Sequence, residues 1–248
     1  MGRITETVKV LLIINILFFV GAMSLGDEAY RLFALFFFEN PNFEYWQPVT
    51  HMFMHGGFMH ILFNMYALWA FGSPLEQMWG RNKFIFFYFS AGLGAALIHS
   101  LVHYYQVHSV MDALLQGGWS PADIQNYLMY GEVGIAPVVE SVTRGDMNSM
   151  MESFHQPAVG ASGAIFGILV AFAMMFPNVE LFLIFVPIPI KAKYFIPVLL
   201  LLDLFSGLTG FSIFGQNIAN WAHLGGALFG FIMMWYWKKN SFNKNRWD

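Results

Sequence analysis

The chain has 248 residues, of which 57% are hydrophobic, 19% aromatic and 11% charged. Soluble domains carry about 25% charged residues, so this composition argues against a water-soluble fold. The net charge of −3, without a basic stripe, argues against nucleic acid as a partner. Because cysteine is absent, disulfides, thiolate zinc sites and cysteine catalysis are excluded.

Long stretches without charged side chains approach or exceed the roughly 20 residues that a helix needs to cross a hydrocarbon core. Divided at glycines, prolines and charge clusters, they predict six spans, at about residues 8–25, 58–76, 83–105, 160–176, 193–211 and 218–237. The first stretch could instead be a signal peptide cleaved near Ala22-Met23-Ser24. We expect an all-α integral membrane protein whose single domain covers residues 1–248.

The basic residues predict an orientation for this bundle. If the N-terminus is cytoplasmic, ten of the 12 lie inside: Arg3, Lys9, Arg81, Lys83, Lys191, Lys193, Lys238, Lys239, Lys244 and Arg246. Cytoplasmic segments of membrane proteins are enriched in Lys and Arg, so both termini are expected inside. The compact form and the lack of glycosylation sequons favour a bacterial inner (plasma) membrane.

Two outer regions exceed a simple turn. Residues 26–57 are rich in apolar and aromatic side chains, a composition suited to lying in the membrane interface. Residues 106–157 form an outer insertion, in which Ser120-Pro121-Ala122-Asp123 predicts a helix start and Met147–Phe154 a short amphipathic turn or helix.

Four polar residues inside the predicted spans are candidates for chemistry, because such groups are costly in a membrane. Ser162 begins the fourth span and His223 lies about two turns into the sixth, so the two can share a depth near the outer surface. A neutral imidazole can take the proton of a hydroxyl nucleophile. The Ser162 backbone N–H and the side chains of His60 and Asn64, which share one helix face, could then stabilise an oxyanion.

Glycines on two spans indicate close helix packing. Gly163 and Gly167 on the fourth span, and Gly226 and Gly230 on the sixth, form faces of small residues that let helices approach closely. A purely structural interpretation is also open, since a serine in a membrane helix commonly bonds to its own backbone and such faces commonly serve packing.

Other chemistries have weaker support. Two histidine groups could bind a metal, although no His-Glu-x-x-His motif is present: His51, His55 and His60, and His99, His103 and His108. Asp203 in the fifth span could orient His223 or make a structural contact, since a separation of 20 residues fixes no geometry. An aspartyl protease would need a second membrane aspartate.

Four separated motifs, in order between Trp46 and Trp237, resemble those of the rhomboid family of intramembrane serine proteases. They are His51-Met52-Phe53-Met54-His55, His60-Ile61-Leu62-Phe63-Asn64, Gly160-Ala161-Ser162-Gly163 and Ala222-His223-Leu224-Gly225-Gly226-Ala227-Leu228-Phe229-Gly230. The resemblance implies a six-helix core with Ser162 and His223 as a catalytic dyad that needs no acid. It assigns His60, Asn64 and the Ser162 amide to the oxyanion hole.

The resemblance also implies supporting roles. It places Phe166 against the imidazole of His223, and makes His51, His55 and Glu76 structural. Two features depart from the family: Gln47 stands where Arg is common, and the insertion at 106–157 replaces a short connection. The first departure puts the charged anchoring of the first outer loop, residues 26–57, in doubt. The second predicts that the insertion modulates substrate access or partner choice.

Together these features predict a serine endopeptidase that cleaves transmembrane substrates within the lipid bilayer, near its outer interface, without a metal or cofactor. Two alternatives are a catalytically inactive rhomboid-like protein that binds membrane clients and a small transporter. The inactive relatives lose the serine or the histidine, whereas this chain has both. A transporter would show related halves, and the sequence has no such repeat.

Overall fold

The structure is a computed structural model that describes residues 3–131, 137–183, 186–211 and 219–240. Its elements are α1 (Glu6–Leu25), α2 (Asp27–Phe33), α3 (Gln47–Thr50), η1 (His51–Phe53), α4 (Phe58–Ala67), η2 (Leu68–Gly72), α5 (Ser73–Trp79), α6 (Arg81–Gln116), α7 (Pro121–Tyr130), α8 (Arg144–His155), α9 (Ser162–Met175), β1 (Glu180–Leu183), β2 (Val186–Lys191), α10 (Ala192–Thr209) and α11 (Asn220–Asn240). The start of the sixth predicted span at residue 218, and the basic residues Lys244 and Arg246, lie outside the described residues.

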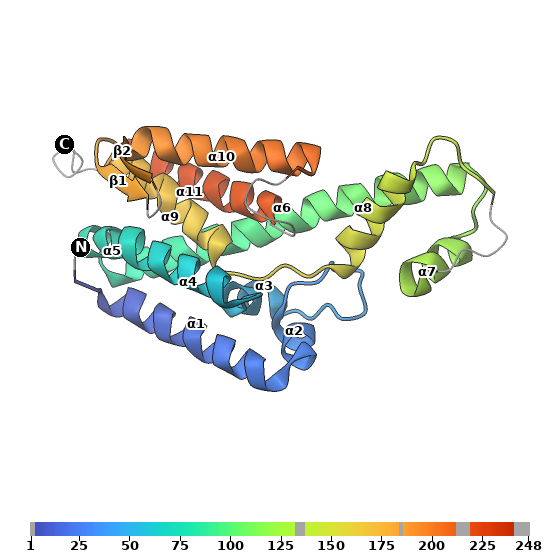
Figure 1. Cartoon of the computed structure of the whole chain (residues 1–248), viewed down its shortest axis with the longest axis horizontal. Helices are drawn as coiled ribbons and strands as arrows, with labels where there is room; N and C mark the ends of the chain where they lie inside the picture. Colours follow the sequence, from blue (N-terminus) through green and yellow to red (C-terminus); the bar gives the residue numbers. More distant parts are fainter. Residues whose placement is uncertain (1–2, 132–136, 184–185, 212–218, 241–248) are drawn as a thin grey trace.

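The helices form a mostly α bundle around α9 (Figure 1). Residues 163–172 of α9 are all buried, and the helix packs against α6 and α11. A helix that is hydrophobic on every side belongs inside a bundle, so the all-apolar sequence of α9 accounts for its central place. Because Ser162 is the first residue of this helix, the core of the bundle fixes its position.

The second predicted span is one continuous helical segment with a local irregularity. It comprises α4, the π-helical turn η2 and α5, in which Pro74 is the second residue. Proline has no N–H to donate and its ring crowds the carbonyl four residues earlier, so the helix widens at this point. His60 and Asn64 lie on the regular part, α4, and therefore share a face as expected.

The structure packs α1 into the bundle. Val8 and Leu11 belong to the main hydrophobic core. The Glu76 carboxylate accepts hydrogen bonds from the backbone N–H groups of Thr7 (2.9 Å) and Val8 (3.0 Å), and from the Thr5 hydroxyl. These amides have no acceptor within α1, so Glu76 acts as an N-terminal cap supplied by another helix. This contact gives the structural role expected for Glu76 a physical basis.

The third predicted span ends later than the sequence indicated. Helix α6 continues from Arg81 to Gln116, beyond the expected boundary at residue 105. No glycine or proline occurs between residue 105 and Gly117, and a loss of hydrophobicity does not by itself end a helix. At about 1.5 Å per residue its 36 residues extend about 54 Å, which exceeds a hydrocarbon core of about 30 Å.

The outer end of α6 from Val107, together with α7 and α8, forms a unit that we call the cap, at the right of Figure 1. The helix start at Ser120 is confirmed as a capping box with Asp123, and a second box joins Thr143 to Asp146. A buried core joins the cap to Phe37 of the first outer loop. Its members are Phe37, Val107, Leu114, Trp119, Ile124, Leu128, Met150 and Phe154.

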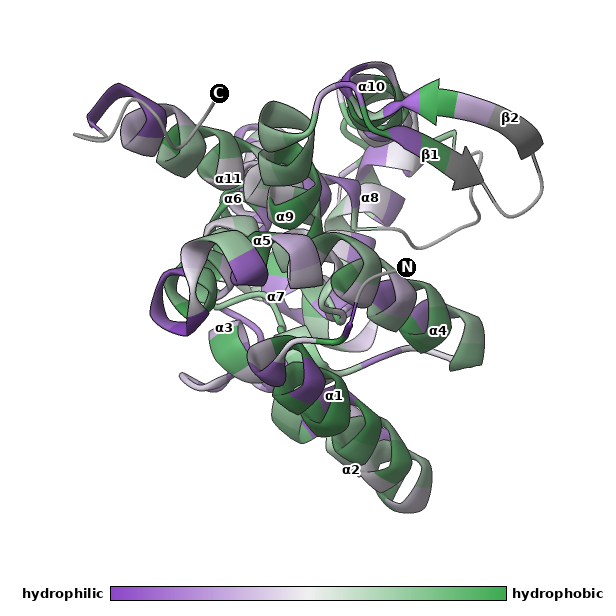
Figure 2. Cartoon of the chain, turned by 90° about the vertical axis from the view of Figure 1, so that its left-hand side faces the viewer, coloured by the Kyte–Doolittle hydropathy of each residue, from purple (hydrophilic) through white to green (hydrophobic). Residues whose placement is uncertain are grey.

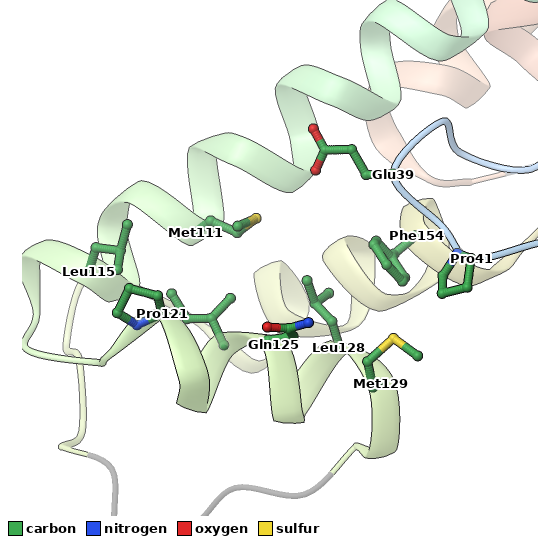
Figure 3. A pocket seen from close by; sticks show the side chains of 10 residues that line it. Glu39, Pro41, Met111, Leu115, Pro121, Gln125, Leu128, Met129 and Phe154 are labelled. Atoms are coloured by element: carbon green, nitrogen blue, oxygen red, sulfur yellow. The ribbon is translucent and has the colours of Figure 1, made fainter. Parts of the chain in front are cut away.

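A cavity of about 310 Å³ lies in the cap beside this core (Figure 3). Met111, Leu115 and Leu128 are among the apolar side chains that line it, and Glu39 and Gln125 contribute polar groups. The Glu39 carboxylate also lies 3.4 Å from Nε2 of His108 on α6. The first outer loop therefore contacts the cap.

An antiparallel pair, β1 and β2, was not expected in an all-α protein. It pairs Glu180 with Lys191 and Leu181 with Ile190, between α9 and α10. Pro187 and Pro189 alternate with β-branched residues in this segment, a sequence that disfavours a helix and suits an extended strand. The hairpin connects two helices and leaves the fold an all-α bundle in outline.

Side chains link four helix ends at the left of Figure 1. The Gln77 side chain donates to the Arg3 carbonyl (3.4 Å), and Nζ of Lys83 lies 4.1 Å from the ring centre of Trp237. The start of α1, the end of α5, the start of α6 and the end of α11 therefore meet at one end. The described basic residues of the predicted inner side belong to these ends and to the hairpin region.

Apolar side chains cover much of the outer surface of the bundle. Figure 2 shows hydrophobic residues along α1 and α4, and the following are at least half exposed: Leu17, Val20, Leu201, Phe205, Leu208 and Trp235. By length and composition, α1, α6 and α10 could each cross a membrane, and α9 is a shorter apolar helix. These features identify a membrane protein. The count of six spans stays a prediction.

Candidate catalytic site

Backbone contact between α9 and α11 brings the two candidate residues together. A Cβ atom added to Gly226 would lie 1.8 Å from the Gly163 carbonyl oxygen, and one added to Gly230 would lie 2.6 Å from Cα of Gly167. Any larger residue would hold the helices apart. The close approach predicted from the glycine pattern is therefore confirmed, and it sets the distance between the starts of these helices.

Ser162 and His223 meet across this contact. Ser162 Oγ lies 2.9 Å from Nε2 of His223, within hydrogen-bond distance. The ring of Phe166, one turn after Ser162 on α9, stacks on the imidazole with centroids 4.1 Å apart and planes 8° apart. The stacking keeps the imidazole in one plane, and in this plane Nε2 faces the hydroxyl.

The structure adds a third group to this pair. Oδ2 of Asp203, on α10, lies 3.1 Å from Nδ1 of His223, and the two side chains are only 6% and 12% exposed. The resemblance implied a dyad that needs no acid, whereas this chain brings a carboxylate into contact with the imidazole. The sequence left this contact open, because a separation of 20 residues between Asp203 and His223 fixes no geometry.

His60 lies near the Ser162 hydroxyl, and Asn64 lies one turn after His60 on α4. The backbone N–H of Gly56 donates to Nδ1 of His60 (3.3 Å), so the neutral ring carries its proton on Nε2. A Cβ added to Gly160 would lie 2.8 Å from that Nε2 and 3.5 Å from Ser162 Oγ. Gly160 therefore makes room at the point where His60 and Ser162 face each other.

Asn64 contributes a second donor. Its side chain is 6% exposed, and its Nδ2 is fully buried without a hydrogen-bond partner in the described part of the chain. A buried amide donor without an acceptor is costly, and such groups concentrate at functional sites. The Ser162 backbone N–H, in the first turn of α9, has no acceptor within that helix.

The segment that precedes Ser162 is fixed to the first outer loop. Leu35 and Ala158 form an antiparallel bridge through two hydrogen bonds of 2.9 Å, and the Gly160 N–H donates to the His51 carbonyl (2.9 Å). Gly160 has a φ of +125°, a conformation that side chains rarely tolerate. The first outer loop and the segment that precedes Ser162 are therefore joined by backbone hydrogen bonds.

Gln47 anchors this loop without a charge. Its side chain is fully buried, and its Oε1 accepts from the Phe36 N–H (3.2 Å). Its Nε2 donates to the carbonyls of Arg31 (3.1 Å) and Asn42 (2.8 Å). Three neutral hydrogen bonds thus anchor the first outer loop at the position where the family commonly has an arginine. An amide can make all three because it both donates and accepts.

His51 and His55 are buried in the same loop. Nδ1 of His51 lies 2.9 Å from the Gln47 carbonyl. Burial lowers the pKa of His51 to about 4, and burial together with the nearby His60 lowers the pKa of His55 to about 4. Both rings are therefore neutral at pH 7.

The second histidine group makes separate contacts. Nδ1 of His103 lies 3.0 Å from the Ser153 carbonyl, which joins α6 to α8, and Nδ1 of His108 lies 3.0 Å from the Tyr104 carbonyl. The His99 and His103 rings lie 3.9 Å apart between centroids. In the described part of the chain no group of three or more His, Asp or Glu residues is arranged to hold a metal ion.

Comparison with known proteins shows similarity to one family. The chain matches the Rhomboid domain family over residues 42–122 and 124–240. It is 26% identical over 187 residues to rhomboid protein 1, mitochondrial, of Saccharomyces cerevisiae. The aligned residues make up 75% of this chain and 40% of that protein. It is 28% identical over 185 residues to the presenilin-associated rhomboid-like protein, mitochondrial, of Homo sapiens, covering 74% and 35% respectively.

A shorter match extends to a bacterial protein. The chain is 35% identical over 54 residues to the rhomboid protease GluP of Bacillus subtilis, covering 22% of this chain and 11% of that protein. The chain spans less than half the length of the curated relatives that it matches. The family match, in contrast, covers well over half of the chain and includes all four motifs. The chain therefore belongs to the rhomboid family.

Proposed function

We propose that this protein is an intramembrane serine endopeptidase that cleaves transmembrane substrates near the outer membrane interface. The observation that carries the proposal is the 2.9 Å contact between Ser162 Oγ and His223 Nε2, and the unpartnered Asn64 donor lies one turn from His60 on α4. A hydroxyl in contact with an imidazole, together with side-chain donors on α4, supports the roles of nucleophile, base and oxyanion-binding groups. Membership of a family that generally consists of such proteases supports the same activity.

The geometry supports a two-step reaction. Ser162 Oγ attacks the scissile carbonyl carbon while its proton passes to Nε2 of His223. The carbonyl oxygen becomes an oxyanion, which accepts hydrogen bonds from His60 Nε2–H, Asn64 Nδ2–H and the Ser162 N–H. His223 then protonates the leaving amine. Water hydrolyses the acyl-enzyme, with His223 as its base, and restores the serine.

The substrate must present an unwound backbone to this site. An intact helix uses its carbonyls in internal hydrogen bonds, so a helical substrate cannot offer one for attack. Small or helix-weakening residues near the interface are therefore the expected cleavage positions. The cap lies beyond the outer ends of the helices, and we propose that it influences which substrates reach the site.

For the setting, we propose a bacterial plasma membrane with both termini in the cytoplasm, supported by the basic residues at one end of the bundle. Two relatives have names that include the word mitochondrial, which makes a mitochondrial membrane the competing location. Since the chain contains no cysteine, single substitutions at Tyr45 and Lys239 permit labelling from each side of the membrane. Labelling of Tyr45→Cys from the cytoplasmic side would contradict the orientation.

The test of the activity is a serine-directed fluorophosphonate, applied to the wild-type protein, Ser162→Ala and His223→Ala in detergent. We expect labelling of the wild type, none of Ser162→Ala and strongly reduced labelling of His223→Ala. Cleavage of a reconstituted transmembrane substrate should follow the same order. A wild-type protein that neither reacts at Ser162 nor cleaves any substrate would refute the proposal and favour an inactive client-binding protein.

A further inference from the structure

Asp203 is a buried acidic residue that the two-residue mechanism does not use. It lies in the outer half of α10, is 5% exposed, and its Oδ2 lies 3.1 Å from Nδ1 of His223. Nδ1 is the ring nitrogen opposite the one that faces Ser162. The serine, the imidazole and the carboxylate therefore form a continuous chain of contacts from α9 through α11 to α10.

The role of Nε2 as the base determines which ring nitrogen carries the proton of the neutral imidazole. To accept the proton of Ser162, Nε2 needs a free lone pair, so the proton of the neutral ring must be on Nδ1. A carboxylate at 3.1 Å accepts a hydrogen bond from Nδ1–H and favours this tautomer. When Nε2 gains the serine proton, the imidazolium formed is next to a negative charge that stabilises it. This role requires no proton transfer to Asp203.

The imidazole is constrained in two independent ways. Phe166 stacks on its face at 4.1 Å, which fixes the plane of the ring but does not distinguish between its two flipped orientations. A hydrogen bond to Asp203 fixes the rotation within that plane, because only one orientation presents Nδ1 to the carboxylate and Nε2 to the serine. The two contacts together define the reactive geometry.

A purely structural link between α10 and α11 would not require a charge. The Asn220 side chain already donates to the Ser206 hydroxyl at 3.1 Å, one turn from Asp203, and this neutral pair joins the same two helices. An ionised carboxylate in a membrane helix is much more costly than an amide or hydroxyl. Its contact with the imidazole that lies within hydrogen-bond distance of Ser162 Oγ indicates a role in the chemistry.

We propose that Asp203 is a positioning residue for His223, so that this rhomboid uses a Ser162–His223–Asp203 triad in place of a dyad. The inference rests on the proposed protease function and deepens it. Asp203 acts through His223, by holding the tautomer and orientation of the ring and by stabilising the imidazolium. It makes no contact with the substrate.

The test compares Asp203→Asn, Asp203→Glu and the matched control Ser206→Ala, which removes the neutral link between the same helices. Cleavage of a transmembrane substrate in proteoliposomes gives kcat and KM separately. For Asp203→Asn we expect kcat to fall by about 100-fold or more with KM within about threefold of the wild type, since a wrong tautomer impairs the chemical step. Asp203→Glu should recover part of kcat, and Ser206→Ala should retain wild-type values.

A measurement on the wild-type protein avoids any dependence on folding of the variants. Nitrogen-15 NMR of labelled histidine should show the His223 proton on Nδ1 at neutral pH. A proton on Nε2, or a kcat for Asp203→Asn within a few-fold of the wild type, would overturn the inference. If the wild-type protein cleaves and is labelled at Ser162 while Asp203→Asn is unimpaired, only the positioning role fails. If the wild type does neither, the protease function fails and the positioning role fails with it.

Discussion

Replacing Gly226 by alanine should separate Ser162 from His223 without changing either residue. The added Cβ would lie 1.8 Å from the Gly163 carbonyl oxygen, whereas ordinary contact begins at 3.4 Å. Because the obstacle is backbone, α9 and α11 have to move apart by about 1.5 Å. The Ser162–His223 distance of 2.9 Å would then open to about 4 Å, beyond hydrogen-bond range.

A displacement of about 1 Å in an active site can reduce the rate by about 100-fold, so we expect at least that loss in kcat. Overpacking should also lower the free energy of unfolding by about 1–3 kcal/mol. The matched control is Gly21→Ala in α1, where nothing lies within 4 Å of the added atom, and this variant should retain activity. Substrate cleavage in proteoliposomes and thermal unfolding in detergent measure the two effects. Gly226→Ala with activity close to that of Gly21→Ala would refute the packing argument.

Three further predictions concern the groups around the pair. Phe166→Leu removes the flat face stacked on His223, and since such stacking is worth about 0.5–1.5 kcal/mol, kcat should fall by up to about tenfold with little change in KM. Gln47→Ala leaves three backbone groups of the first outer loop without partners, which should lower the free energy of unfolding by roughly 3 kcal/mol. The control Gln77→Ala changes an exposed side chain and should have little effect. Equal melting temperatures of the two variants would contradict this prediction. The pKa values of His51 and His55 are about 4 in the folded protein and about 6.5 when unfolded, so the unfolded chain binds more protons between these values. Stability should therefore be full above pH 6.5 and fall as the pH approaches 4, by up to about 3 kcal/mol per histidine; a melting temperature that stays constant from pH 7 to pH 4 would contradict this assignment.

Much of the bundle could be predicted because membrane helices have a strong sequence signal. Hydrophobic length and Gly, Pro and charge boundaries located the helical regions, and the glycine pattern on α9 and α11 predicted a contact that the structure shows. His60 and Asn64 could be placed together because both lie on one regular helix. The proximity of Ser162 and His223 followed from helix direction and depth.

Features that depend on tertiary packing could not be predicted. Hydrophobicity falls along α6 after residue 105, but the helix continues because α8 packs on it and the cap core buries Val107 and Leu114. The β1–β2 hairpin lies in an apolar segment whose prolines signal a break without identifying a strand. Asp203 required the relative rotation of α10 and α11, which no local pattern encodes.

The segment between α8 and Ser162 is attached both to the cap and to the first outer loop. Helix α8 leads directly into the residues before Ser162, and the Asn40 side chain donates to the Phe154 carbonyl at its end (2.8 Å). The Leu35–Ala158 bridge then fixes the segment to the first outer loop before it reaches the site. The Ser162–His223 distance, in contrast, depends on the Gly163–Gly226 contact, which lies within the bundle. The sequence and shape of the cap can therefore vary while the Gly163–Gly226 contact, which sets the Ser162–His223 distance, stays the same.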